Sequence, residues 1–183
     1  MRVILHMAAA LSLVVAPALA EETSYARGGE TLFTFDAPAG WTLAKTPEID
    51  PAAMPEGENP IPPLITLRPP GEQRIMWGAL WSPDYLTDLA ETDSWLDGLL
   101  PRLMDWPEVK IREPRDVGGL PAEVATGSGE RNGRMLDFAL GAVQIAEGRV
   151  AVAAFIGEPG AFDRHEHVLV ALFESIRAAE TIR

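Results

Sequence analysis

The sequence predicts an α+β fold: an α/β/α sandwich with a mainly antiparallel sheet flanked by helices, the terminal helix packed on the sheet. First, apolar residues alternate over several short segments, a pattern that is typical of strands. Second, tight-turn signals, of which Asn132-Gly133 is the strongest, join the later strands as antiparallel hairpins. Third, an apolar stripe at helical spacing near the C-terminus predicts a helix that covers one face of the sheet.

Residues 1–20 have the layout of a cleavable secretory signal peptide. Arg2 supplies the positive charge, an uncharged apolar run covers 7–15, and an A-x-A motif ends at Ala20, so cleavage is expected between Ala20 and Glu21. The apolar run is shorter than the roughly 20 residues of a membrane-spanning helix. We therefore expect a periplasmic or secreted protein without an integral membrane segment.

The composition is acidic and contains no cysteine. There are 27 Asp and Glu residues against 15 Lys and Arg, a formal net charge of −12, and cleavage removes Arg2. Such a charge repels phosphate backbones and anionic lipid, so we expect no nucleic-acid partner. The absence of cysteine excludes thiol catalysis and, together with export, favours a bacterial periplasm.

The first half of the chain is predicted to contain a flexible lead-in at 21–29, followed by a single α+β domain over 30–183. Residues 47–63 are rich in proline, which excludes helix or central strand, so a surface loop is expected there. Short strands are predicted on both sides of this loop, at 30–36, 42–46, 64–68 and 73–81.

The second half is predicted to be helix, antiparallel strands and helix. Residues 83–104 show a leucine stripe that Pro101 interrupts, which indicates two short helices or one kinked helix. The closing helix is expected over 161–177, where Phe162 and Leu172 belong to the apolar stripe. The strands between the two helical regions are predicted at 109–117, 120–129, 134–146 and 150–156.

Trp77 and Trp81 are the candidate binding residues. They lie four residues apart on a predicted strand, so both side chains face the same side of the sheet. Aromatic rings in this arrangement can stack on a sugar or line an apolar pocket. The alternative, which we favour, is that both rings belong to the core beneath a helix. Trp41, which follows a Pro-x-Gly turn, is expected to close one end of the sandwich.

No catalytic or metal-binding pattern stands out, so we expect a protein that is not an enzyme and has no metal or cofactor. His165 and His167 are two residues apart on a predicted helix, so their rings point in different directions and do not form a metal pair. Ser128 lacks the glycines two residues away on either side that a nucleophile elbow requires. No phosphate-binding glycine motif is present.

Three short segments resemble the Mog1/PsbP-like superfamily. They are the strand and turn from Phe33 to Trp41, the Gly119-Leu-Pro-Ala122 strand that leads into a hairpin, and the closing helix from Phe162 to Ile176. The resemblance implies an α/β/α sandwich and a bacterial periplasmic member of this superfamily. It does not extend to the superfamily's photosystem or nuclear-transport roles, because the features of those roles are absent.

Two functions follow as hypotheses. The leading one is an exported, non-catalytic protein-binding, adaptor or chaperone-like module whose partner is another envelope protein. The alternative is a small-molecule binding protein, for lipid or sugar, that uses an aromatic-lined pocket at Trp77 and Trp81. The sequence leaves the oligomeric state open.

Overall fold

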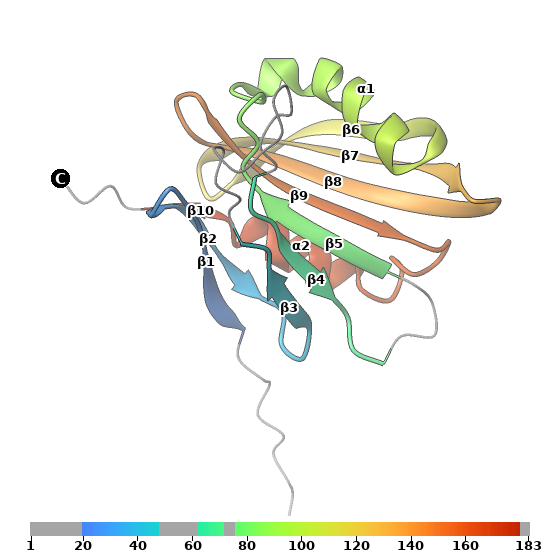
Figure 1. The fold of residues 1–183 in the computed structure, drawn as a ribbon, viewed down its shortest axis with the longest axis horizontal. Coiled ribbons are helices and arrows are strands. Elements are labelled where there is room, and N and C mark those ends of the chain that lie inside the picture. The colour runs from blue at the N-terminus through green and yellow to red at the C-terminus, as the bar shows by residue number, and fades with distance from the viewer. Residues whose placement is uncertain (1–19, 48–61, 72–75, 180–183) are drawn as a thin grey trace, which may run out of the picture.

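Ten strands and two α-helices make up the described part of the chain. The computed structural model describes residues 20–47, 62–71 and 76–179. The predicted signal segment up to residue 19 and most of the predicted proline-rich loop, 48–61, lie outside the described residues. The strands and helices follow the predicted order of strands, helix, strands and helix, and a short strand at Arg177–Ala178 comes after the last helix (Figure 1).

The main sheet has seven strands and is antiparallel throughout. Its order is β3-β4-β5-β9-β8-β7-β6, which places β9 near the centre and β6 and β3 at the two edges. The strands are β3 (Thr42–Lys45), β4 (Ile65–Arg68), β5 (Met76–Trp81), β6 (Asp105–Val117), β7 (Leu120–Arg131), β8 (Arg134–Ala146) and β9 (Arg149–Gly157).

The hairpin predicted at Asn132-Gly133 is confirmed. Asn132 has φ +53° and Gly133 has φ +74°, the left-handed pair that a type I′ turn between twisted strands requires. The turn fixes the register of β7 against β8, with Arg131 opposite Arg134. Strand β6 begins at Asp105, four residues before the predicted start at Val109.

A second sheet contains β1 (Glu21–Arg27), β2 (Glu30–Ala37) and β10 (Arg177–Ala178). The prediction of a flexible lead-in at 21–29 was therefore wrong, because this segment pairs with β2 through a two-residue Gly28-Gly29 turn. Tyr25 is buried and stacks on Phe33, with ring centroids 4.8 Å apart. This apolar contact fixes β1 to β2. β1 begins at Glu21, directly after the predicted cleavage point between Ala20 and Glu21.

The helices are shorter than predicted. After a 3₁₀ turn at Leu89–Glu91, α1 covers Thr92–Leu103 as one helix, with Pro101 inside its last turn. Pro101 is tolerated there because the helix ends two residues later, so little helix remains to be kinked. Helix α2 covers Glu166–Glu174, and residues 161–165 form turns.

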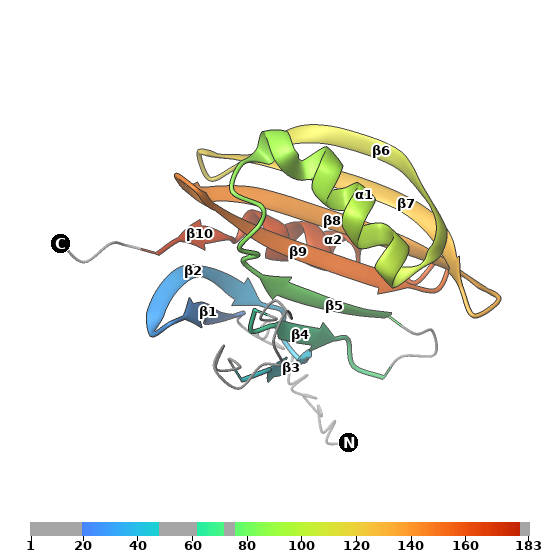
Figure 2. The same ribbon diagram turned by 45° about the horizontal axis from the view of Figure 1, so that its top comes forward.

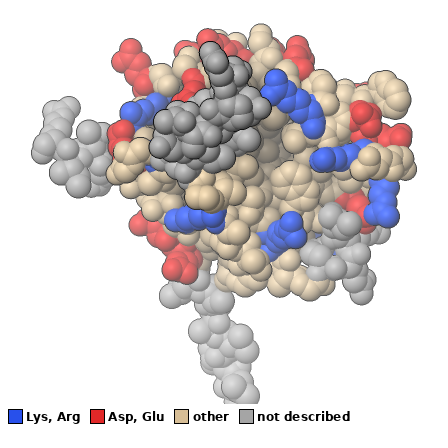
Figure 3. Space-filling model, in the orientation of Figure 1, with Lys and Arg blue, Asp and Glu red and all other residues tan. Residues whose placement is uncertain are grey.

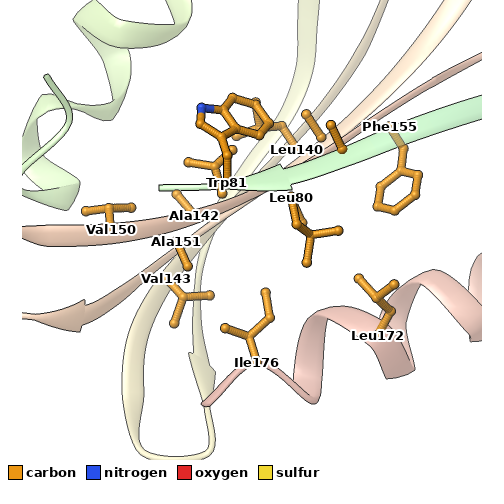
Figure 4. Close-up of a cluster of buried hydrophobic side chains, with 14 of the residues drawn as sticks. Leu80, Trp81, Leu140, Ala142, Val143, Val150, Ala151, Phe155, Leu172 and Ile176 are labelled. Carbon is orange, nitrogen blue, oxygen red and sulfur yellow. The ribbon is translucent and has the colours of Figure 1, made fainter. Parts of the chain in front are cut away.

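The helices lie on opposite faces of the main sheet, which confirms the predicted α+β sandwich with a terminal helix on the sheet (Figures 1 and 2). On β5, Trp81 and Leu80 point to opposite sides, and Leu80 faces Leu172 and Ile176 at the C-terminal end of the chain (Figure 4). Residues 150–157 of β9 are all buried, because this strand is covered on both faces.

Candidate functional site

Trp81 belongs to the core. Its side chain is 8% exposed and packs against Trp95 of α1, with ring centroids 6.1 Å apart. Val152 lies opposite Trp81 on the neighbouring strand and is also buried. Trp81 therefore joins α1 to the sheet and is not accessible to a ligand.

Trp77 lies on the same face of β5, as predicted, and has different surroundings. It is partly buried and lines a cavity of about 340 Å³ near one end of the sheet. No residue of α1 lines this cavity. The structure thus assigns the two predicted residues to different environments, because α1 covers Trp81 and does not line the cavity at Trp77. The cavity is lined by Trp77, Arg131, Asn132, Arg134, Leu136, Ile156, Gly157 and Glu158.

Trp41 is partly buried beside a second cavity of about 640 Å³. Its ring meets Phe155 edge-on at a centroid distance of 6.2 Å and His165 at 5.5 Å. These contacts join the turn after β2 to β9 and to the start of α2. The residues around this cavity are Glu21, Glu22, Thr23, Ser24, Ala37, Pro38, Ala39, Gly40, Trp41, Leu43 and Lys45.

The histidines and serine weighed for chemistry do not line either cavity, although the His165 ring contacts Trp41 beside the larger one. His165 immediately precedes α2, and His167 is exposed within the first turn of that helix. Ser128 is buried on β7, opposite Asp137 of β8. In the described ranges, no group of three or more His, Asp or Glu side chains is placed to hold a metal ion. Neither described helix is long and apolar enough to cross a bilayer.

The edge strand β6 carries a surface that the sequence did not predict. Trp106 is 83% exposed and has φ +45°, an unusual backbone conformation for a bulky residue. Val109 and Ile111 on the same strand are also exposed. Irregularities in the β6–β7 register lie between Asp105 and Glu108 and between Val109 and Ile111. Val109 lies opposite Gly127 and Ile111 opposite Thr126, so the bulge between them turns their side chains to opposite faces of the sheet. We call Trp106, Val109 and Ile111 the exposed edge residues.

Ion pairs hold β6 on its inner side. Arg112 forms ion pairs with Glu123 of β7 and with Asp93 of α1. These contacts connect the edge strand to its neighbour and to the covering helix. The outer edge of β6 has no neighbouring strand in the main sheet, since β6 is last in the strand order of the described chain.

The sequence contained one signal for this surface. Trp106 lies between the predicted end of the helix at residue 104 and the predicted start of a strand at residue 109, so it was not assigned to an element. Its position outside any predicted element was the one sign of exposure, since tryptophan is highly buried on average. Its location on an edge could not be inferred, because strand order depends on long-range pairing.

The antiparallel sheet with a terminal helix packed on it matches the fold of a solved PsbP-like protein. The cyanobacterial PsbP protein (CyanoP) of Synechocystis sp. PCC 6803 has a similar solution structure, with a TM-score of 0.52 and 14% identity, over 91% of this chain and 96% of that chain. This similarity shows the fold alone. No protein-family model matches this sequence. No curated protein matches it either.

Two further solved structures share the fold. A protein of unknown function from Pseudomonas aeruginosa, described as a candidate regulator, is 13% identical with a TM-score of 0.51, over 87% of this chain and 99% of that chain. A crystal structure from Bacteroides thetaiotaomicron is 9% identical with a TM-score of 0.52, over 90% of this chain and 50% of that chain.

Proposed function

We propose that this chain is an exported, non-catalytic domain that binds another protein of the cell envelope along β6. The observation that carries the proposal is Trp106, a tryptophan 83% exposed and held at φ +45° on an edge strand. Residues in strained backbone conformations concentrate at functional sites. Exposed tryptophans are also enriched among the residues that contribute most to binding between proteins.

The export and the lack of catalysis rest on the sequence. The signal-peptide pattern ending at Ala20 supports transfer to the periplasm. The absence of a recognisable nucleophile elbow or phosphate loop supports a binding role over an enzymatic one. The PsbP-like fold is compatible with such a role but does not determine it.

The length and position of β6 support docking by strand addition. β6 has 13 residues and lies at an edge, whereas β3 at the opposite edge has four. An edge strand presents backbone N–H and C=O groups to an extended segment of a partner. The exposed edge residues would then contact apolar side chains of that segment, with Val109 and Ile111 on opposite faces of the sheet.

β6 also has features that limit how much of its edge a partner strand can pair with. Pro107 and Pro114 lack N–H donors, and bulges disturb the regular pairing of the strand. Charged residues along the strand, including Glu108 and Lys110, have the same effect. Since these features limit pairing to part of the strand, we assign the edge to a short extended segment of a different envelope protein, with apolar side chains that meet the exposed edge residues.

The test begins with a photoreactive amino acid at Ile111, which is 55% exposed, in cells of the source organism. The cross-linked envelope protein is identified, purified and titrated with this chain. Trp106→Ala is expected to raise the Kd at least tenfold, which corresponds to about 1.4 kcal/mol. Hydrogen exchange of the amides of 105–117 is expected to slow in the complex.

Tyr85→Ala is the matched control, because Tyr85 is an exposed aromatic residue, 64% accessible, outside β6. It is expected to leave the Kd within twofold of the original value. Both variants are expected to unfold at the same temperature as the original protein, since substitutions of exposed residues rarely change stability by more than about 0.5 kcal/mol. No cross-linked partner, or equal effects of the two variants, contradicts the proposal.

A further inference from the structure

The cavity beside Trp77 has an apolar floor. Trp77 lies opposite Ile156 in the β5–β9 register, and Ile156 lies opposite Phe138 in the β9–β8 register. Cross-strand partners share one face of a sheet, so these side chains lie side by side. Leu136, two residues before Phe138 on β8, faces the same way and lines the cavity. The apolar part of a ligand, such as an alkyl chain, can pack against this floor.

The rim of the cavity is basic, although the chain is strongly acidic. Arg131 and Arg134 flank the type I′ turn between β7 and β8, and both line the cavity. Arg134 pairs with Glu158 at 3.4 Å, and the exposed fractions of the two side chains are 68% and 30%. Such an exposed pair contributes little and can rearrange, so it does not prevent Arg134 from meeting a ligand.

The charged residues that line this cavity favour a negatively charged ligand. Two arginines face one glutamate in this lining, whereas Glu21 and Glu22 face Lys45 in the cavity at Trp41. The whole chain carries a formal charge of −12. A guanidinium group presents paired N–H donors that match the two oxygens of a carboxylate. The two arginines at the rim near Trp77 can therefore attract an anion locally, although the chain as a whole is negatively charged.

We propose that this cavity binds a small amphipathic anion: an alkyl carboxylate whose chain lies on Trp77, Leu136 and Ile156 and whose carboxylate is bound by Arg131 and Arg134. The volume of about 340 Å³ is at the lower end of the range of about 300–1,000 Å³ typical of ligand sites, which favours a medium-length chain. No residue of β6 lines the cavity, so this binding is independent of the proposed protein partner.

The probe is decanoate, titrated into the mature protein by isothermal calorimetry below its micelle concentration. We expect saturable binding with one site per chain. Acetate lacks the apolar body and decyltrimethylammonium has the opposite charge, so both are expected to bind at least tenfold more weakly. Equal binding of decanoate and decyltrimethylammonium, or no saturable binding of decanoate, overturns the proposal.

Variants of the two rim arginines test whether decanoate binds in this cavity. Arg131→Gln with Arg134→Gln is expected to weaken decanoate binding at least tenfold. Arg68→Gln with Arg102→Gln changes the net charge equally at two exposed positions outside the cavity, so it is expected to keep the original affinity. Equal weakening by the two double variants would show a general charge effect and overturn the assignment to this cavity.

Trp77 supplies a direct optical readout. Decanoate is expected to shift the fluorescence of the protein, and Trp77→Phe is expected to remove that shift while retaining most of the binding, because a phenyl ring preserves the apolar floor. Persistence of the shift in Trp77→Phe would place the ligand beside another tryptophan, such as Trp41, and would overturn the site. Thermal unfolding of each variant, measured without decanoate, confirms that the variants are folded.

Discussion

Phe173 of α2 lies directly over Gly141 of β8. A Cβ atom at position 141 would be 2.1 Å from Cε2 of the Phe173 ring, a distance that no real pair of non-bonded carbon atoms tolerates. Gly141 is buried, and Ala153 lies opposite it on β9. The missing side chain at 141 therefore allows the aromatic ring, and with it α2, to approach the sheet closely.

Gly141→Ala is expected to lower the free energy of unfolding by about 1–3 kcal/mol, because the added methyl group displaces the Phe173 ring or shifts β8. Urea denaturation followed by circular dichroism measures the change. Gly98→Ala is the matched control, since Gly98 lies in α1, where an added methyl group would have no neighbouring atom within 4 Å. Alanine there is expected to stabilise the protein by about 0.5–1 kcal/mol. Equal stabilities of the two variants contradict the close contact.

Ser175 joins the end of α2 to β2. Its hydroxyl donates to the carbonyl of Leu172 at 2.6 Å and accepts the backbone N–H of Asp36 at 2.8 Å. Ser175 is 6% exposed, so water does not readily replace it. Ser175→Ala leaves the Asp36 N–H without this partner and is expected to lower the free energy of unfolding by about 1–3 kcal/mol.

Hydrogen exchange at Asp36 tests this role separately from stability. The Asp36 amide is expected to exchange faster in Ser175→Ala than in the original protein, because its acceptor is removed. Ser94→Ala is the matched control, since Ser94 is an exposed serine in the first turn of α1. It is expected to change the unfolding free energy by no more than about 0.5 kcal/mol. An unchanged Asp36 exchange rate contradicts the proposed link.

Local patterns predicted most of the main sheet. The alternation of apolar residues and the Asn132-Gly133 turn are short-range signals, and they located strands β7 to β9 within a few residues. The same kind of signal is present at Gly28-Gly29. β1 was nevertheless predicted as flexible, although Gly28 and Gly29 both have positive φ in a hairpin turn.

The candidate site depended on information that periodicity does not contain. The shared face of Trp77 and Trp81 followed from their spacing, but their different burial depends on where α1 lies over the sheet. The exposure of Trp106 depends on β6 being an edge strand. Strand order and helix position result from contacts between distant segments, which a local pattern does not specify.

The exposed ion pair between Arg149 and Glu30 is expected to depend on pH. Arg149 at the start of β9 donates to both carboxylate oxygens of Glu30 at the start of β2, at 2.9 and 3.1 Å. The hydrogen bond from Arg149, and then its charge, lower the pKa of Glu30 below its ordinary value. The pair connects the small sheet to the main sheet.

Figure 3 shows other acidic and basic side chains spread over one face of the molecule.

The sign of the pH effect follows from the lowered pKa. Glu30 is ionised more readily in the folded chain than in the unfolded chain, so the pair stabilises the fold above the unfolded pKa of about 4.3. That contribution is lost as the pH falls through the lower pKa of the folded state. The original protein is therefore expected to be more stable than Glu30→Gln at pH 7, and this difference is expected to disappear in strong acid.

NMR titration of the Glu30 carboxyl group measures the interaction directly. Its pKa is expected to rise towards the ordinary range in Arg149→Gln, because both the hydrogen bond and the positive charge are removed. Arg68→Gln removes an exposed arginine from β4 and is expected to leave the pKa of Glu30 unchanged. High salt is expected to reduce the difference between the original protein and Arg149→Gln, because exposed charges are screened. Identical pKa values of Glu30 in the original protein and in Arg149→Gln would show that the contact does not persist in solution.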